Sequence, residues 1–217
     1  MIATGLADAR DDLDELAPLL RRAYSLDPRG LARLRRDGDR LAALVRLPFG
    51  VLAARTINVP SAAAGVDVTV RVADALAWLD GERDDPPEAR DAQWRGGLPP
   101  TGGWRRIDTV PDTAVRPLVR SGALALKEAA EREGVPGAQP RAEVADALLD
   151  AVVLTVSDDA GQRAEVTLRT LSAVTRLGFL PRGSSIAVDI AGRWTRVAAS
   201  YGSVFAERPG LDLGMLR

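Results

Sequence analysis

Valines alternate with polar residues along one short stretch of this chain, and this alternation limits what the chain can fold into. Residues 66–72 read Val-Asp-Val-Thr-Val-Arg-Val. Successive side chains of a strand point to opposite faces, so this pattern predicts a half-buried β-strand. The period then lengthens, because Val72, Leu76 and Leu79 share a face only on a helix. The stretch therefore predicts a strand that runs directly into a short helix.

A second stretch has a related pattern. Residues 67–79 and 165–177 align without a gap and match at a valine, a threonine, an arginine, an alanine and a leucine. The match indicates either an internal duplication or the chance similarity of two strand-helix segments in a chain rich in Ala, Val, Leu and Arg. We expect an α+β fold with helices packed on antiparallel β-hairpins. A duplication would arrange this fold as two pseudo-symmetric helix-hairpin-helix repeats.

The remaining periodicities predict further helices and strands. Helices are expected over 6–22 with a break at Pro18, over 30–47, over 112–133, and from Pro140 onward. Strands are expected over 51–59, 151–156, 164–170 and 186–190. The strand 51–59 should form a hairpin with 66–72, and 151–156 should form one with 164–170. Apolar residues in 194–206 recur at spacings of three and four, which favours a helix there.

Between the two aligned stretches lies a segment of different composition. Residues 80–103 are rich in acids, prolines and glycines, which predicts a long loop. We expect a region 1–79, a loop 80–111 and a region 112–217, with the two regions either separate or joined in one domain. Trp94 and Trp104 argue against a disordered loop, because large aromatic side chains usually dock on a surface.

Composition excludes several kinds of chemistry. The chain of 217 residues contains no cysteine and no histidine. This absence excludes disulfides, cysteine nucleophiles, Ser-His-Asp hydrolases and ordinary zinc enzymes. The formal net charge of -1 leaves no overall field that favours nucleic acid or anionic lipid. We therefore predict no catalytic residue, no metal site and no cofactor, and we favour a protein that is not an enzyme.

Three motifs resemble functional sites but lack a required part. Gly178–Ser185 has the glycine spacing of a phosphate-binding loop without its lysine, so a turn is expected. Asp80, Glu82, Asp84 and Asp91 have the spacing of a calcium loop, but Asp85 stands where that loop needs glycine, so a solvated acidic loop is expected. Asp146 and Asp150 lie one helical turn apart and could form a carboxylate pair, or could simply face water.

The densest basic run follows the predicted turn at residues 25–28. Arg29, Arg33, Arg36 and Arg40 recur at helical spacing along the predicted helix 30–47, and such a face could follow phosphates. Asp37 and Asp39 interrupt the run. GC-rich coding also favours arginine over lysine, so the number of arginines is weak evidence of function.

These observations favour a non-catalytic binding or interaction protein in the cytoplasm of a high-GC bacterium. Its contact surface would lie at the seam between the repeats or on the loop with Trp94 and Trp104. One alternative is a small-molecule-binding protein or carboxylate-based enzyme with a pocket between the hairpins. Another is a nucleic-acid binder that uses the four arginines, and self-association into a homo-oligomer stays open. We predict no membrane association, because no apolar run is long enough to span a bilayer and no signal peptide is evident.

Overall fold

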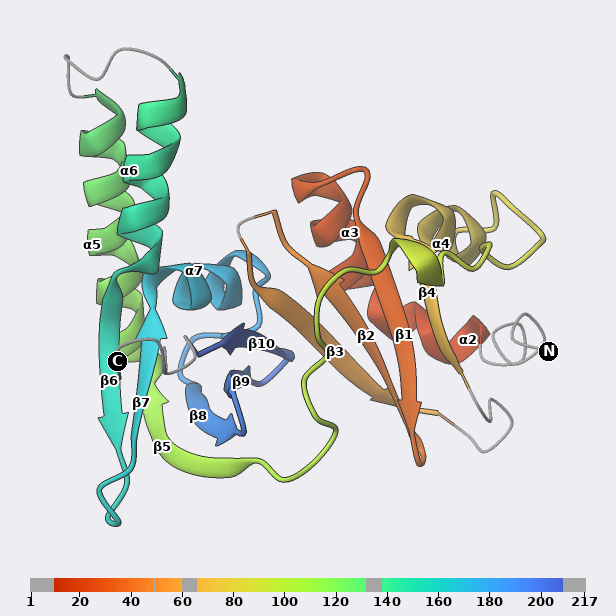
Figure 1. Ribbon diagram of the computed structural model, residues 1–217. Coiled ribbons are helices and arrows are strands. Elements are labelled where there is room, and N and C mark those ends of the chain that lie inside the picture. The colour runs from red at the N-terminus through yellow and green to blue at the C-terminus, as the bar shows by residue number, and fades with distance from the viewer. Residues whose placement is uncertain (1–9, 49, 60–65, 132–137, 209–217) are drawn as a thin grey trace, which may run out of the picture. The chain divides into compact units, whose positions relative to one another are not determined.

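The computed structural model describes residues 10–48, 50–59, 66–131 and 138–208 (Figure 1). The chain forms two compact units, Met1–Thr101 and Gly102–Arg217. Each unit combines helices with antiparallel strands, which confirms the predicted α+β fold. None of the helices in the described residues is long and apolar enough to span a membrane. Residues 6–9 and 132–133, which belong to two of the predicted helices, lie outside the described residues.

Unit 1 contains a four-stranded antiparallel sheet in the order β4-β1-β2-β3. Its helices are α2 (Arg10–Leu13), α3 (Ala17–Leu26) and α4 (Val72–Leu79), with 3-10 turns η1 (Asp14–Leu16) and η3 (Asp91–Gln93). Its strands are β1 (Leu31–Asp37), β2 (Arg40–Arg46), β3 (Leu52–Asn58) and β4 (Asp67–Arg71). Pro18 lies in the first turn of α3, so the predicted break in the first helical segment is confirmed.

The helix predicted over residues 30–47 is wrong, because this segment forms the β1–β2 hairpin. Asp37 pairs with Arg40, which leaves Gly38 and Asp39 as a two-residue turn. Gly38 has φ +58°, and glycine at the first central position is typical of a type II′ hairpin turn. The leucines of this segment fit the spacing of a helix as well as that of two strands. The turn residues Gly38 and Asp39 are therefore the signal that distinguishes a hairpin from a helix.

The hairpin predicted between 51–59 and 66–72 is also wrong. Both strands exist as β3 and β4, but β3 pairs with β2 and β4 pairs with β1. β4 therefore lies at the outer edge of the sheet rather than beside β3. The predicted passage from strand to helix is confirmed, because α4 begins directly after Arg71.

Unit 2 contains a four-stranded antiparallel sheet in the order β5-β8-β9-β10 and a separate hairpin β6–β7. Its strands are β5 (Arg105–Pro111), β6 (Val152–Ser157), β7 (Arg163–Thr167), β8 (Ser185–Ala191), β9 (Trp194–Ala199) and β10 (Gly202–Glu207). Its helices are α5 (Asp112–Glu131), α6 (Ala138–Asp150) and α7 (Leu168–Arg176). The predicted hairpin of 151–170 is confirmed, although its second strand ends at Thr167 and α7 begins earlier than expected.

The helix predicted over residues 194–206 is wrong, because β9 and β10 form a hairpin there. Val197 and Val204 pair on one face of these strands and are fully buried. Trp194 and Phe205 lie on the other face and are also buried. Apolar side chains on both faces hide the two-residue alternation of a strand, which is why the sequence pattern misled.

The two units share one pattern of strand pairing, but its parts are joined in a different chain order. In each, a helix (α3 or α7) leads into a three-stranded meander, β1-β2-β3 or β8-β9-β10. In each, an outer strand pairs with the first meander strand and is followed by a helix, as β4–α4 and β5–α5. The sequence match instead aligned β4–α4 with β7–α7, and β7 belongs to the separate hairpin β6–β7. The repeat is therefore one of strand pairing: β4–α4 follows its meander in the chain, whereas β5–α5 precedes its own. The aligned segments occupy different places in this repeat.

Gly122 lets α5 approach α7 closely. A Cβ built on Gly122 would lie 2.3 Å from Leu168 Cδ1 and 2.9 Å from Leu168 Cγ, and Leu168 is buried. Alanine normally stabilises a helix over glycine by roughly 1 kcal/mol. Here we expect Gly122→Ala to lower the free energy of unfolding by about 1–3 kcal/mol, because the added methyl overpacks the contact. Urea denaturation measures the change, and Ser121→Ala on the exposed face of α5 should be neutral or stabilising.

Candidate interaction surface

The two faces of the unit 1 sheet differ in chemistry. Leu34, Leu41 and Val68 lie on one face and are buried. The opposite face carries five arginines. Arg33 pairs with Leu44 and Thr69, and each of the others lies an even number of residues along its strand from one of these three positions. We call it the arginine face: Arg33, Arg35, Arg40, Arg46 and Arg71. Asp37 and Asp67 are the acidic residues on the same face of these strands, so the arginine face has excess positive charge.

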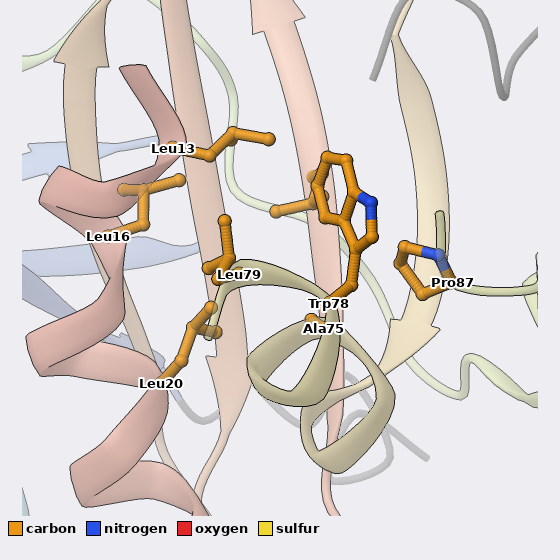
Figure 2. A pocket seen from close by; sticks show the side chains of 8 residues that line it. Leu13, Leu16, Leu20, Ala75, Trp78, Leu79 and Pro87 are labelled. Carbon is orange, nitrogen blue, oxygen red and sulfur yellow. The ribbon is translucent and has the colours of Figure 1, made fainter. Parts of the chain in front are cut away.

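The helix-covered face holds an apolar crevice between α3, α4 and β1 (Figure 2). Its lining residues are Leu13, Leu16, Leu20, Leu34, Ala75, Trp78, Leu79 and Pro87. The free volume is about 10 Å³, roughly the room that one water molecule needs. The lining offers no polar surface, so the crevice is a gap in core packing rather than a site for a polar metabolite.

The loop predicted over residues 80–103, called the linker from here on, is irregular apart from η3 (Figure 1). It contacts the arginine face through hydrogen bonds and one aromatic ring. Arg35 Nη2 donates to the carbonyl oxygen of Pro99 at 3.0 Å, and Arg46 Nη2 donates to that of Arg95 at 3.0 Å. The Arg46 guanidinium also lies 6.0 Å from the centre of the Trp94 ring, at the limit of a cation-π contact. Two arginines thus hold the linker on the sheet.

The linker also closes the free edge of β4. Thr69 N donates to Asp91 Oδ1 at 2.7 Å, and Arg90 N donates to Thr69 O at 2.7 Å. Arg33 Nη1 approaches the same Asp91 carboxylate at 3.4 Å. An edge strand whose backbone groups are free can pair with another chain, so this contact protects the edge.

The arginines on this face differ in how their charge is balanced. Arg33 Nε donates to Asp67 Oδ1 at 2.7 Å, and this hydrogen bond is the main reason why the pKa of Arg33 is raised. Burial lowers the pKa of Arg35, partly offset by the charges of Asp67 and Asp37. Arg35 and Arg46 donate to neutral carbonyls, so their positive charge is not balanced by a hydrogen-bonded carboxylate.

The four arginines expected to share a helix face do not share one. Arg29 precedes β1 in a turn, where its backbone N–H donates to Asp27. Arg33 and Arg40 lie on the arginine face, whereas Arg36 lies on the opposite face and its Nε donates to Gly38 O. The helical grouping is therefore wrong, because β1 and β2 are strands. Arg35, Arg46 and Arg71 were not assigned to the predicted face, although the spacing of two between Arg33 and Arg35 is typical of one face of a strand.

Trp104, the second tryptophan, docks on the sheet of unit 2. The Arg196 guanidinium lies 4.4 Å from the centre of its ring, and Phe205 packs against it with ring centres 5.5 Å apart. Arg196 Nε donates to Asp189 Oδ2 at 2.9 Å, and Arg106 Nε donates to the other carboxylate oxygen. The Asp189 side chain is only 2% exposed. Trp94 and Trp104 thus each contact an arginine of their own unit.

Two of the three motifs that resembled functional sites have structural partners here. Gly183 N donates to the Asp112 carboxylate at 3.2 Å, so the loop 178–185 binds a side chain of this protein. Asp146 and Asp150 both accept from Arg169, so both are held in ion pairs with that arginine. Among the described residues, no group of three or more acidic side chains is placed to hold a metal ion.

Two family models match the chain. One, described as "Domain of unknown function (DUF8185)", matches residues 99–211, which is more than half of the chain. The chain belongs to this family. The second, described as "Domain of unknown function (DUF8010)", matches residues 4–96. The two matched ranges correspond to the two units of the fold. The sequence matches none of the curated proteins that were compared.

Solved structures with a similar fold are bacterial sliding clamps. The DNA polymerase III subunit beta of Pseudomonas aeruginosa is 10% identical with a TM-score of 0.54, covering 96% of this chain and 67% of that one. A DNA polymerase sliding clamp of Caulobacter crescentus is 11% identical with a TM-score of 0.53, covering 91% and 63%. A ligand-bound sliding clamp of P. aeruginosa is 10% identical with a TM-score of 0.55, covering 93% and 63%. This DUF8185 protein therefore has the sliding-clamp fold and spans about two thirds of those chains.

The buried Asp189 carboxylate should be important for stability. Asp189→Asn leaves Arg196 and Arg106 without their negative partner, and breaking a buried ion pair is strongly destabilising. We expect the free energy of unfolding to fall by about 3 kcal/mol, at the low end of the range for broken buried ion pairs, because Arg106 can turn toward water. Guanidinium denaturation measures this loss. Glu207→Gln breaks the exposed pair with Arg193 and should cost less than about 1 kcal/mol; equal losses would contradict this account.

The Asp112 carboxylate should make stability depend on acid pH. Its hydrogen bond from Arg116 is the main reason why the pKa of Asp112 lies below its ordinary value of 3.8, and the Gly183 N–H also contributes. A lowered folded-state pKa stabilises the protein above the unfolded pKa, and this stabilisation is lost as pH falls through the folded pKa. The stability difference between wild type and Asp112→Asn should therefore be largest above about pH 4 and shrink at lower pH. Thermal melts from pH 2 to 7 measure it, and a constant difference would contradict the prediction.

Proposed function

We propose that this DUF8185 protein is a non-catalytic interaction protein that binds partner proteins through the sheet faces of its clamp-like units. The observation that carries the proposal is the sliding-clamp fold, which extends over 96% of the chain in one comparison. The similar structures are a DNA polymerase III subunit beta and a DNA polymerase sliding clamp. That role belongs to those proteins, and its transfer to this chain is part of the proposal.

The chemistry of the chain supports a non-catalytic role. The sequence contains no histidine and no cysteine, the usual sources of a base or nucleophile near neutral pH. Four carboxylates that could have served instead are bound by arginines: Asp112, Asp146, Asp150 and Asp189. These carboxylates are therefore already engaged as partners in structural ion pairs.

The other predicted functions remain open as proposals. A small-molecule site between hairpins has less support, since β3 and β4 do not form the expected hairpin. A nucleic-acid site now has the arginine face as its basis instead of a helix. Three of these five arginines already bind groups of this chain: Arg33, Arg35 and Arg46. A cytoplasmic location and self-association stay predictions.

The test is capture followed by reconstitution. Tagged wild-type protein should retain a specific protein from an extract of its native cells, and the purified partner should raise its melting temperature at saturating concentration. A library of metabolites should leave the melting temperature unchanged. Stabilisation by a metabolite without any reconstituted protein partner would contradict the proposal. Binding to DNA that weakens steeply with salt would favour the nucleic-acid alternative.

A further inference from the structure

We propose that the arginine face is a docking site for an extended, acidic segment of a partner protein that carries an aromatic anchor, and that linker residues 94–99 occupy this site in the chain itself. The inference rests on the proposed function and specifies the surface and the chemistry of the partner. The linker serves as the example of what the surface can bind.

The linker contacts the sheet as a bound peptide does. Residues 94–99 read Trp-Arg-Gly-Gly-Leu-Pro and form no helix or strand. Their contacts with the arginine face are two backbone carbonyls, those of Arg95 and Pro99, and one aromatic ring, that of Trp94. Backbone acceptors give affinity to any extended segment, while a pocket or cation for one side chain gives selectivity. The surface should therefore accept other segments of this form.

Arg46 and Gly96 form a close contact that holds the linker in place. Gly96 has φ +91°, and a Cβ there would lie 2.5 Å from Arg46 Nη2 and 3.3 Å from Arg46 Cζ. Only glycine adopts this backbone conformation without strain, and a Cβ at this position would force the Arg46 guanidinium to move from its place. A larger residue at position 96 should release the linker while keeping the arginines of the sheet.

The linker is an imperfect occupant. The guanidinium groups of Arg35 and Arg46 donate only to neutral carbonyl oxygens of the linker. The linker also brings a further positive charge, that of Arg95. Charge-assisted hydrogen bonds to a carboxylate are stronger than those to a carbonyl. Trp94 Nε1 is buried without a hydrogen-bond partner among the described residues, which also weakens the bound state. A segment with a carboxylate between the two arginine positions should bind better than the linker does.

The test uses the full chain and fluorescent peptides of residues 90–101. The Gly96→Ala protein should bind the peptide about tenfold more tightly than wild type, because its own linker no longer occupies the arginine face. Gly103→Ala is the matched control, since Gly103 has φ +75° but no atom within 4 Å of its Cβ position, and it should bind like wild type. If Gly96→Ala fails to fold by circular dichroism, Trp94→Ala replaces it as the variant that releases the linker.

The chemistry of the partner is tested with peptide variants. A peptide with Gly97→Asp should bind Gly96→Ala about tenfold more tightly than the natural sequence, and one with Trp94→Ala should lose binding. Adding Arg46→Ala to the protein should abolish the preference for the acidic peptide. Equal binding to the Gly96 and Gly103 variants, or equal binding of all peptides, would overturn the inference. Tighter binding of single-stranded DNA than of the acidic peptide would also overturn it and assign the face to nucleic acid.

The inference and the proposed function can fail separately. If the peptides do not bind but wild-type protein still forms a reconstituted complex with a captured partner, the docking site lies elsewhere and the interaction role stands. If the peptides bind as expected but no partner is reconstituted, the proposed function fails and the arginine face serves only to hold the linker.

Discussion

Arginine side chains that reach across the sheets hold much of this structure together. In unit 1 they bind the backbone of the linker, through Arg35 and Arg46. In unit 2, Arg196 lies between the buried Asp189 carboxylate and the Trp104 ring. Guanidinium groups suit both tasks, because they are planar, stay charged when partly buried and stack on aromatic rings. In unit 1 these contacts add to the hydrogen bonds that Arg90 and Asp91 make with Thr69, and together they hold the linker on the sheet.

This use of arginine also changes how composition should be interpreted. The sequence shows many arginines and almost no lysine, and GC-rich coding is a sufficient explanation for that bias. The structure shows that several of them nevertheless have defined hydrogen-bond partners. A bias that arises from coding can still supply the side chains on which packing then depends. The count of arginines was uninformative about function, whereas their position on strands was informative.

The sequence predicted the fold class and those elements whose apolar pattern occurs on one face only. β4 with α4 and the β6–β7 hairpin belong to this group. Prediction failed at β1–β2, where leucine spacing fits both periods, and at β9–β10, where both faces are apolar. Sheet order could not be deduced, because the pairing of β4 with β1 is a long-range choice that local periodicity does not encode. The arginine face was missed for the same reason, since it exists only once two hairpin strands and β4 are correctly paired.

The closure of the β4 edge has a consequence for assembly. Thr69 is the middle residue of that five-residue strand, and its outward N–H and C=O are both occupied by the linker. A second copy that tried to extend the sheet at β4 would have to displace two hydrogen bonds before gaining any. Growth of fibres by strand addition at this side is therefore disfavoured even at high concentration. Any homo-oligomer of this chain should use a surface other than the outer side of β4.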